Sequence, residues 1–104
     1  MKCVRIVTFV PADEATGLAK NLAQHIPQIG DEYDGVCWWS QPKMEAGTEQ
    51  FRPKGGDLQQ EPSVRMEFSV PDEDKTIEAF LKQLKSAHPW DSPVILKYTH
   101  ELSL

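Results

Sequence analysis

Apolar and polar residues alternate along residues 64–71 (VRMEFSVP), and residues 4–11 (VRIVTFVP) align with this stretch as a repeat of it. A period of two places successive side chains on opposite faces of a β-strand, so each stretch is typical of a strand with one buried face. We therefore predict strands over residues 3–10 and 64–70. The side chains expected on the buried face are Val4, Ile6, Thr8, Val10, Val64, Met66, Phe68 and Val70.

Each of these strands is followed by a helical pattern, which makes the two stretches copies of one repeated unit. Both strands end in Val-Pro, and acidic residues and then apolar residues spaced by three and four follow. Proline suits the first turn of a helix, and carboxylates there interact favourably with the helix dipole. The pattern predicts helices over residues 12–26 and 72–87. A histidine close to a proline ends each helix (His25 and His88), and a role at the helix end is the first interpretation of both.

Two further stretches, residues 33–40 and 94–101, are rich in strand-forming residues. The resulting order, βαβ followed by βαβ, predicts an α+β fold. This is the ferredoxin-like βαββαβ sandwich, with a four-stranded antiparallel sheet and two helices on one face. Residues 1–104 would form a single domain, because a chain of this length builds one core. We expect the first and third strands in the middle of the sheet, joined by a right-handed crossover as a parallel pair.

The sheet face away from the helices carries apolar groups as well as charged ones. By alternation, Val7 and Phe9 point to this side, together with one of the adjacent residues Trp38 and Trp39. Such a surface predicts self-association, sheet face against sheet face. The alternative is that the long connection over residues 41–63 folds across the face within one chain. The other residues expected on this face are Cys3, Arg5, Arg65, Glu67 and Ser69.

Composition and charge narrow the classes of partner. The 104 residues carry a net charge of −5 and have a pI near 5.1, which argues against binding to nucleic acid or to an anionic membrane surface. No apolar run approaches the roughly 20 residues that a membrane-spanning helix requires. The opening residues, KCVRIVTFVP, have the pattern of a strand rather than of a signal peptide. Two cysteines, Cys3 and Cys37, make no disulfide framework, so a cytoplasmic protein with reduced thiols is predicted.

The sequence contains none of the common catalytic motifs. It has no HExxH, no CxxC, no GxSxG and no phosphate-binding glycine loop. We therefore predict a protein that is not an enzyme and has no cofactor. As an alternative, Cys37, His88 and His100 offer soft metal ligands. Because none of them is spaced as a chelating pair, the fold or a subunit interface would have to assemble such a site.

Several short motifs along the chain resemble one known family. They are a strand ending in Val-Pro, an Ile-Gly…Tyr…Cys segment, an FRP triplet and a second Val-Pro strand whose helix leads to AHPW. The matching residues are Val10, Pro11, Ile29, Gly30, Tyr33, Cys37, Gly47, Phe51, Arg52, Pro53, Val70, Pro71, Ala87, His88, Pro89, Pro93 and Tyr98. Together they resemble the middle domain of the YqfO family, the dimetal proteins related to the NGG-interacting-factor group. That inserted domain is in turn similar to the CutA and PII signalling proteins.

The resemblance implies a standalone CutA/PII-like domain that assembles as an oligomer, with a trimer favoured. It also implies that a ligand pocket, if present, is bordered by Phe51, Arg52, His88 and Trp90. The chain departs from the family pattern at Trp38-Trp39 and after His88, where Trp-Asp-Ser replaces Tyr-Glu-Glu. The two halves that carry the family's metal ligands have no counterpart in this sequence, so the resemblance does not extend to their metal chemistry.

These observations predict a small, non-catalytic, cytoplasmic domain that associates with itself and is regulatory or binds a small ligand or a protein partner. Neither nucleic acid nor a membrane is expected as a partner. Two alternatives stay open. One is a metal-binding protein that uses cysteine and histidine at a subunit interface, and the other is an accessory subunit of a dimetal hydrolase-like assembly.

Overall fold

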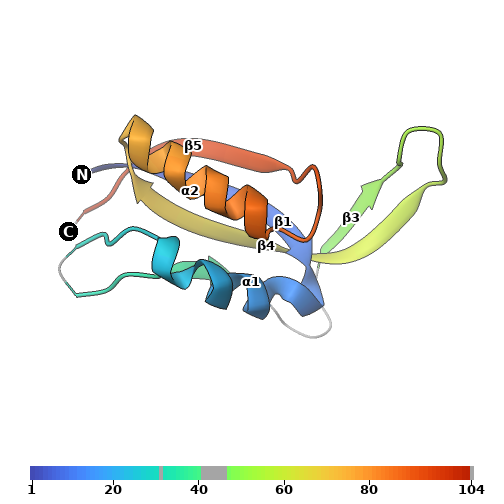
Figure 1. The fold of residues 1–104 in the computed structure, drawn as a ribbon, viewed down its shortest axis with the longest axis horizontal. Helices are drawn as coiled ribbons and strands as arrows, with labels where there is room; N and C mark the ends of the chain where they lie inside the picture. The colour runs from blue at the N-terminus through green and yellow to red at the C-terminus, as the bar shows by residue number, and fades with distance from the viewer. Residues whose placement is uncertain (31, 41–46, 104) are drawn as a thin grey trace.

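A computed structural model describes residues 1–30, 32–40 and 47–103, in which an antiparallel sheet carries two helices (Figure 1). The strands are β1 (Lys2–Pro11), β2 (Cys37–Trp39), β3 (Gly47–Phe51), β4 (Gln59–Pro71) and β5 (Ile95–Glu101), and the helices are α1 (Ala15–Leu22) and α2 (Asp74–Ala87). Short 3-10 turns, Ala12–Glu14 and Ala23–His25, extend α1 at its two ends. The order across the sheet is β2, β4, β1, β5, and β3 pairs with β4 as a fifth strand. The predicted ferredoxin-like α+β sandwich is therefore confirmed, with one strand more than expected.

The two central strands, β1 and β4, are adjacent as predicted, but they are antiparallel, so the prediction of a parallel pair is wrong. Their register places Val4 opposite Val70 and Val10 opposite Val64. The connection through α1 leaves β1 and β2 running in the same direction, since both are antiparallel to β4. The β3–β4 hairpin then reverses the chain, because a short hairpin joins only antiparallel strands.

The connection predicted over residues 41–63 contains β3, so the expectation of a loop is wrong for this part of the chain. β3 pairs with the first residues of β4, up to Ser63. β1 ends at Pro11, which also lies opposite Ser63, so β1 does not pair with the residues of β4 that precede Ser63. There β3 and β4 pair with each other alone and form a two-stranded arm. Figure 1 shows the arm projecting past the ends of the helices rather than lying over the sheet. Residues 41–46 lie outside the described residues.

The strand predicted over residues 33–40 is shorter than expected. Only Cys37, Trp38 and Trp39 pair with β4. Val36, immediately before them, is 61% exposed, so its apolar side chain contributes little to the packing that would extend the strand.

The core lies between the sheet and the helices. All eight side chains predicted on the buried face of the two central strands are buried. Phe68 on β4 and Phe80 on α2 connect the two layers, with ring centroids 5.0 Å apart. Thr8 is the polar member of the buried face, and its hydroxyl donates a hydrogen bond to the carbonyl oxygen of Val94 at 3.0 Å. The other buried apolar residues of the core are Ala15, Leu18, Leu22, Ile26 and Leu84.

The first residue and the end of β5 lie side by side (Figure 1). The terminal amine of Met1 is 3.1 Å from the carbonyl oxygen of Leu102, and the backbone N–H of Leu102 donates to the carbonyl of Met1 at 2.9 Å. The same amine lies 3.6 Å from the carboxylate of Glu101. These contacts hold both ends of the described chain at one edge of the molecule.

Candidate functional site

His88 ends α2, as predicted, and is buried with 7% of its surface exposed. The backbone N–H of Trp90 donates a hydrogen bond to its Nδ1 at 3.0 Å, so Nδ1 is an acceptor and carries no proton. The ring proton is therefore on Nε2, which donates to the carbonyl oxygen of Phe9 at 2.9 Å. His88 thus connects the end of α2 to β1, in addition to its place at the helix end.

Burial lowers the pKa of His88 below its ordinary value of 6.5, because the protonated ring would lose its hydration there. The hydrogen bond to Phe9 and the nearby carboxylate of Glu14 act in the opposite direction, but the effect of burial is larger. Protonation of Nδ1 would also remove the acceptor that the N–H of Trp90 uses. The native structure therefore favours a neutral imidazole.

We expect the free energy of unfolding to decrease as the pH falls below 6.5, partly through this ring. The unfolded chain takes up the proton at the ordinary pKa and the native chain only at the lowered one, so between these values acid favours the unfolded state. Above 6.5 the stabilising contribution is fully present. Denaturant titrations of the native protein and of His88→Gln across this pH range should give a smaller pH slope for the variant. Equal slopes would contradict the assignment of a lowered pKa to His88.

Phe51 and Trp90, both predicted to border a ligand pocket, lie close together, with Phe51 at the end of β3 that is nearer the tip of the arm. Their ring centroids are 6.2 Å apart and their planes are inclined at 47°. The ring of His88 lies 5.4 Å from that of Trp90. Three of the four predicted side chains are therefore brought together. Arg52 directly follows β3 and is exposed.

A cavity of about 410 Å³ lies between β3 and the segment that follows α2. Arg52 is not among the residues that line it. Glu49 is, and it shares one side of β3 with Phe51 because alternate residues of a strand face the same way. Burial raises the pKa of the Glu49 carboxyl above its ordinary value, since the ionised form loses hydration. The lining residues are Glu49, Phe51, Pro53, Trp90, Asp91 and Ser92.

No signal in the sequence pointed to Glu49. The strand that places it, residues 47–51, is mostly polar and exposed, and has no apolar alternation to mark it. Asp91 stands in the AHPWDSP segment that ends the second helix, but only the folded chain brings it to the same cavity as Glu49.

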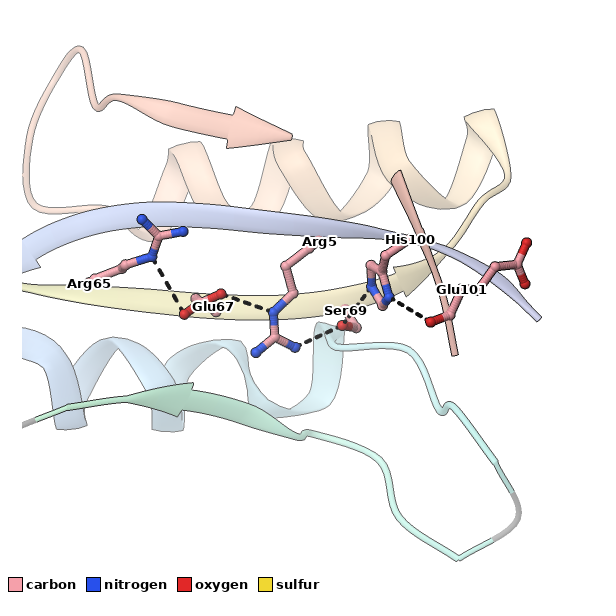
Figure 2. Close-up of polar contacts among 6 residues, drawn as sticks. All are labelled: Arg5, Arg65, Glu67, Ser69, His100 and Glu101. Carbon is pink, nitrogen blue, oxygen red and sulfur yellow. Dashed lines mark hydrogen bonds and ion pairs between the residues drawn. The ribbon is translucent and has the colours of Figure 1, made fainter. Parts of the chain in front are cut away.

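The open face, which is the side of the sheet away from the helices, carries a connected polar network (Figure 2). The carboxylate of Glu67 lies 3.1 Å from Nε of Arg5 and 3.5 Å from Nε of Arg65. Nη1 of Arg5 donates to the hydroxyl of Ser69 at 2.8 Å, and this hydroxyl lies 3.3 Å from Nε2 of His100. Two guanidinium groups share one carboxylate, so the network carries an excess of positive charge.

The apolar groups exposed on the open face differ from those predicted. Val7 is fully buried within the single chain, where the register surrounds it with the longer side chains of Glu67 and Leu96. Trp38, rather than Trp39, points to this face and is 51% exposed, and Tyr98 is 49% exposed. A hollow of about 280 Å³ lies beside Trp38. Its lining residues are Arg5, Pro27, Ile29, Val36, Cys37, Trp38, Ser69 and Leu102.

The three candidate metal ligands lie in different surroundings. Cys37 packs against the core, and burial raises the pKa of its thiol, which favours the protonated form that binds metals poorly. His100 belongs to the polar network of the open face, and both ring nitrogens of His88 already form hydrogen bonds. Within the described ranges, no group of three or more His, Cys, Asp and Glu side chains is arranged to hold a metal ion.

The sequence matches no protein-family model and no curated protein. The fold is that of the CutA-type ferredoxin-like proteins, because solved CutA structures superpose on almost the whole chain. One is CutA from Xylella fastidiosa, with a TM-score of 0.70 and 12% identity, covering 98% of this chain and 86% of that one. Another is the periplasmic divalent cation tolerance protein CutA from Archaeoglobus fulgidus, with a TM-score of 0.64 and 15% identity, covering 98% and 87%.

The chain is also similar to a Bacillus cereus protein related to NIF3, with a TM-score of 0.77 and 24% identity. The match covers 97% of this chain and 26% of that protein, so the chain spans about a quarter of its length. At these identities the likeness shows the fold alone. The predicted CutA/PII-like fold is confirmed, whereas the more specific YqfO assignment stays a prediction.

Neither helix in the described part of the chain combines the length and the apolarity that crossing a bilayer requires. The cytoplasmic location stays a prediction, since one of the similar CutA proteins is described as periplasmic.

Proposed function

We propose that this chain is a non-catalytic domain that associates with copies of itself through the open face and holds a small ligand in the cavity between β3 and the segment after α2. A trimer is the assembly that we propose. In this reading Phe51 and Trp90 contact the ligand, His88 positions Trp90, and the exposed Arg52 lies beside the site.

The observation that supports the proposed self-association is the residue composition of the open face. Trp38 and Tyr98 leave about half of their surfaces exposed, on the two sides of a network that contains Arg5. Exposed aromatic and arginine side chains are enriched at the centres of protein interfaces, where they fill pockets of the partner. The hollow beside Trp38 offers such a pocket to a second copy. The described part of the arm projects away and does not cover this face (Figure 1).

Replacing Tyr98 with aspartate is expected to dissociate the assembly, because an unpaired carboxylate in a dry interface costs several kcal/mol. Sedimentation velocity at tens of micromolar protein should show a native species close to three times the 11.8 kDa chain mass, and a variant near one chain mass.

Lys97→Asp is the matched control for this experiment. Lys97 is the exposed neighbour of Tyr98 on β5, but it lies opposite Ile6 and so belongs to the helix side of the sheet. It should leave the sedimentation coefficient unchanged, while circular dichroism checks that both variants fold. A monomeric native protein at this concentration would refute the proposed self-association.

A further inference from the structure

The cavity between β3 and the segment after α2 has an acidic lining, and no lysine or arginine is among the described residues that line it. Glu49 and Asp91 both line it. Glu61 lies directly opposite Glu49 in the β3–β4 pairing, so its carboxylate starts from the same face of the arm. None of the ion pairs found among the described residues includes any of these three carboxylates.

Two aromatic rings complete the lining. Phe51 and Trp90 approach each other at an angle, with ring centroids 6.2 Å apart. Trp90 is held in place by its neighbour His88, through a ring contact at 5.4 Å and the hydrogen bond from its own backbone N–H. A rigid tryptophan reduces the cost of ordering the site when a ligand binds.

Aromatic rings and carboxylates attract the same kind of ligand. The face of an aromatic ring is electron-rich and attracts a cation within about 6 Å, most strongly in the case of tryptophan. A partly buried carboxylate such as Glu49, whose pKa burial raises, gains from a nearby positive charge because that charge favours its ionised form.

We infer that this cavity binds a small organic ammonium cation, which sits against Phe51 and Trp90 and is balanced in charge by Glu49 and Asp91. The inference deepens the ligand-binding part of the proposed function and does not depend on self-association. An organic cation fits better than a bare metal ion. A hard divalent cation takes six or more oxygen ligands, whereas half of this lining consists of two aromatic rings and a proline.

The test compares choline with its uncharged isostere 3,3-dimethylbutan-1-ol, called dimethylbutanol below, in which a carbon atom replaces the ammonium nitrogen. Nitrogen–proton correlation spectra of the full chain monitor the indole N–H resonance of Trp90. This resonance is assigned because it is missing from the spectrum of Trp90→Phe. Choline should shift this resonance saturably, with a dissociation constant on the order of millimolar. Dimethylbutanol should bind at least about tenfold more weakly, because it lacks the charge. The resonances of Trp38 and Trp39 serve as internal references and should stay in place.

Variants separate the two parts of the site. Glu49→Gln should weaken choline binding at least about fivefold and leave the affinity for dimethylbutanol unchanged. Phe51→Leu should weaken choline binding while keeping the carboxylates. Glu78→Gln, a matched charge removal on the exposed side of α2, should have no effect on either.

Three results would overturn the inference. They are the absence of a saturable shift up to about 50 mM choline, equal affinity for choline and dimethylbutanol, or unchanged choline binding by Glu49→Gln. Sedimentation of the same samples reports the oligomeric state. A failed titration with an intact assembly rejects only the ligand class, whereas a monomer that binds choline rejects only the self-association.

Discussion

Replacing Phe68 with alanine is expected to lower the free energy of unfolding by about 3–5 kcal/mol, the range observed for Phe→Ala in packed cores. Phe68 is fully buried, and its ring contacts that of Phe80 with centroids 5.0 Å apart. The register places it opposite Ile6 on β1 and Cys37 on β2. Removing the ring therefore leaves a cavity where three strands and α2 meet. Denaturant titration at a fixed protein concentration measures the loss, because association makes stability depend on concentration.

Phe51→Ala makes the same chemical change on the two-stranded arm. The side chain of Phe51 is 37% exposed, and its aromatic contact with Trp90 contributes about 1 kcal/mol. A loss at Phe68 no larger than that at Phe51 would contradict the packing described between the sheet and α2.

His88→Ala is expected to cost about 2–3 kcal/mol, more than the 1 kcal/mol or less of a histidine that only ends a helix. The change removes the partners of two backbone groups, the carbonyl of Phe9 and the N–H of Trp90. Both are partly buried, so water replaces the lost bonds poorly. Thermal and denaturant unfolding of the variant measure the difference.

His25→Ala tests whether position at a helix end is enough. His25 closes the turn after α1 and is exposed, so its removal should change stability by no more than about 0.5 kcal/mol. If the two histidine variants were equally stable, the link from His88 to β1 would contribute nothing and the simpler helix-end role would stand.

The strands and helices that the sequence predicted correctly are those whose burial leaves a periodic pattern. β4 alternates Val64, Met66, Phe68 and Val70 with polar residues because one face packs on the helices. β3 carries no such pattern, since its side chains are mostly exposed and backbone pairing alone places it beside β4. The direction of β4 was mispredicted for the same reason. The hairpin that reverses the chain was not visible in the pattern.

The candidate site shows the same division. The AHP motif places His88 at the end of a helix, but its contact with Phe9 joins residues 79 positions apart, and no local pattern encodes such a contact. The resemblance predicted that Phe51 and Trp90 border one pocket, and the structure places their ring centroids 6.2 Å apart. The resemblance did not include Glu49, whose position depends on the unpredicted strand β3.

The mutual hydrogen bonds between Met1 and Leu102 hold the two ends of the described chain next to each other. Domains with adjacent ends tolerate insertion into a surface loop of another protein, because the host loop has to open only slightly. The same geometry permits circular permutation, in which a short linker joins the old ends and new ends are opened elsewhere. The tip of the two-stranded arm, residues 53–58, is exposed and lies at the far end of the molecule from the present ends (Figure 1). A permutant opened there would keep the core and the open face. Its N- and C-termini would lie at the tip of the arm, so a fused protein would be attached at the opposite end of the molecule.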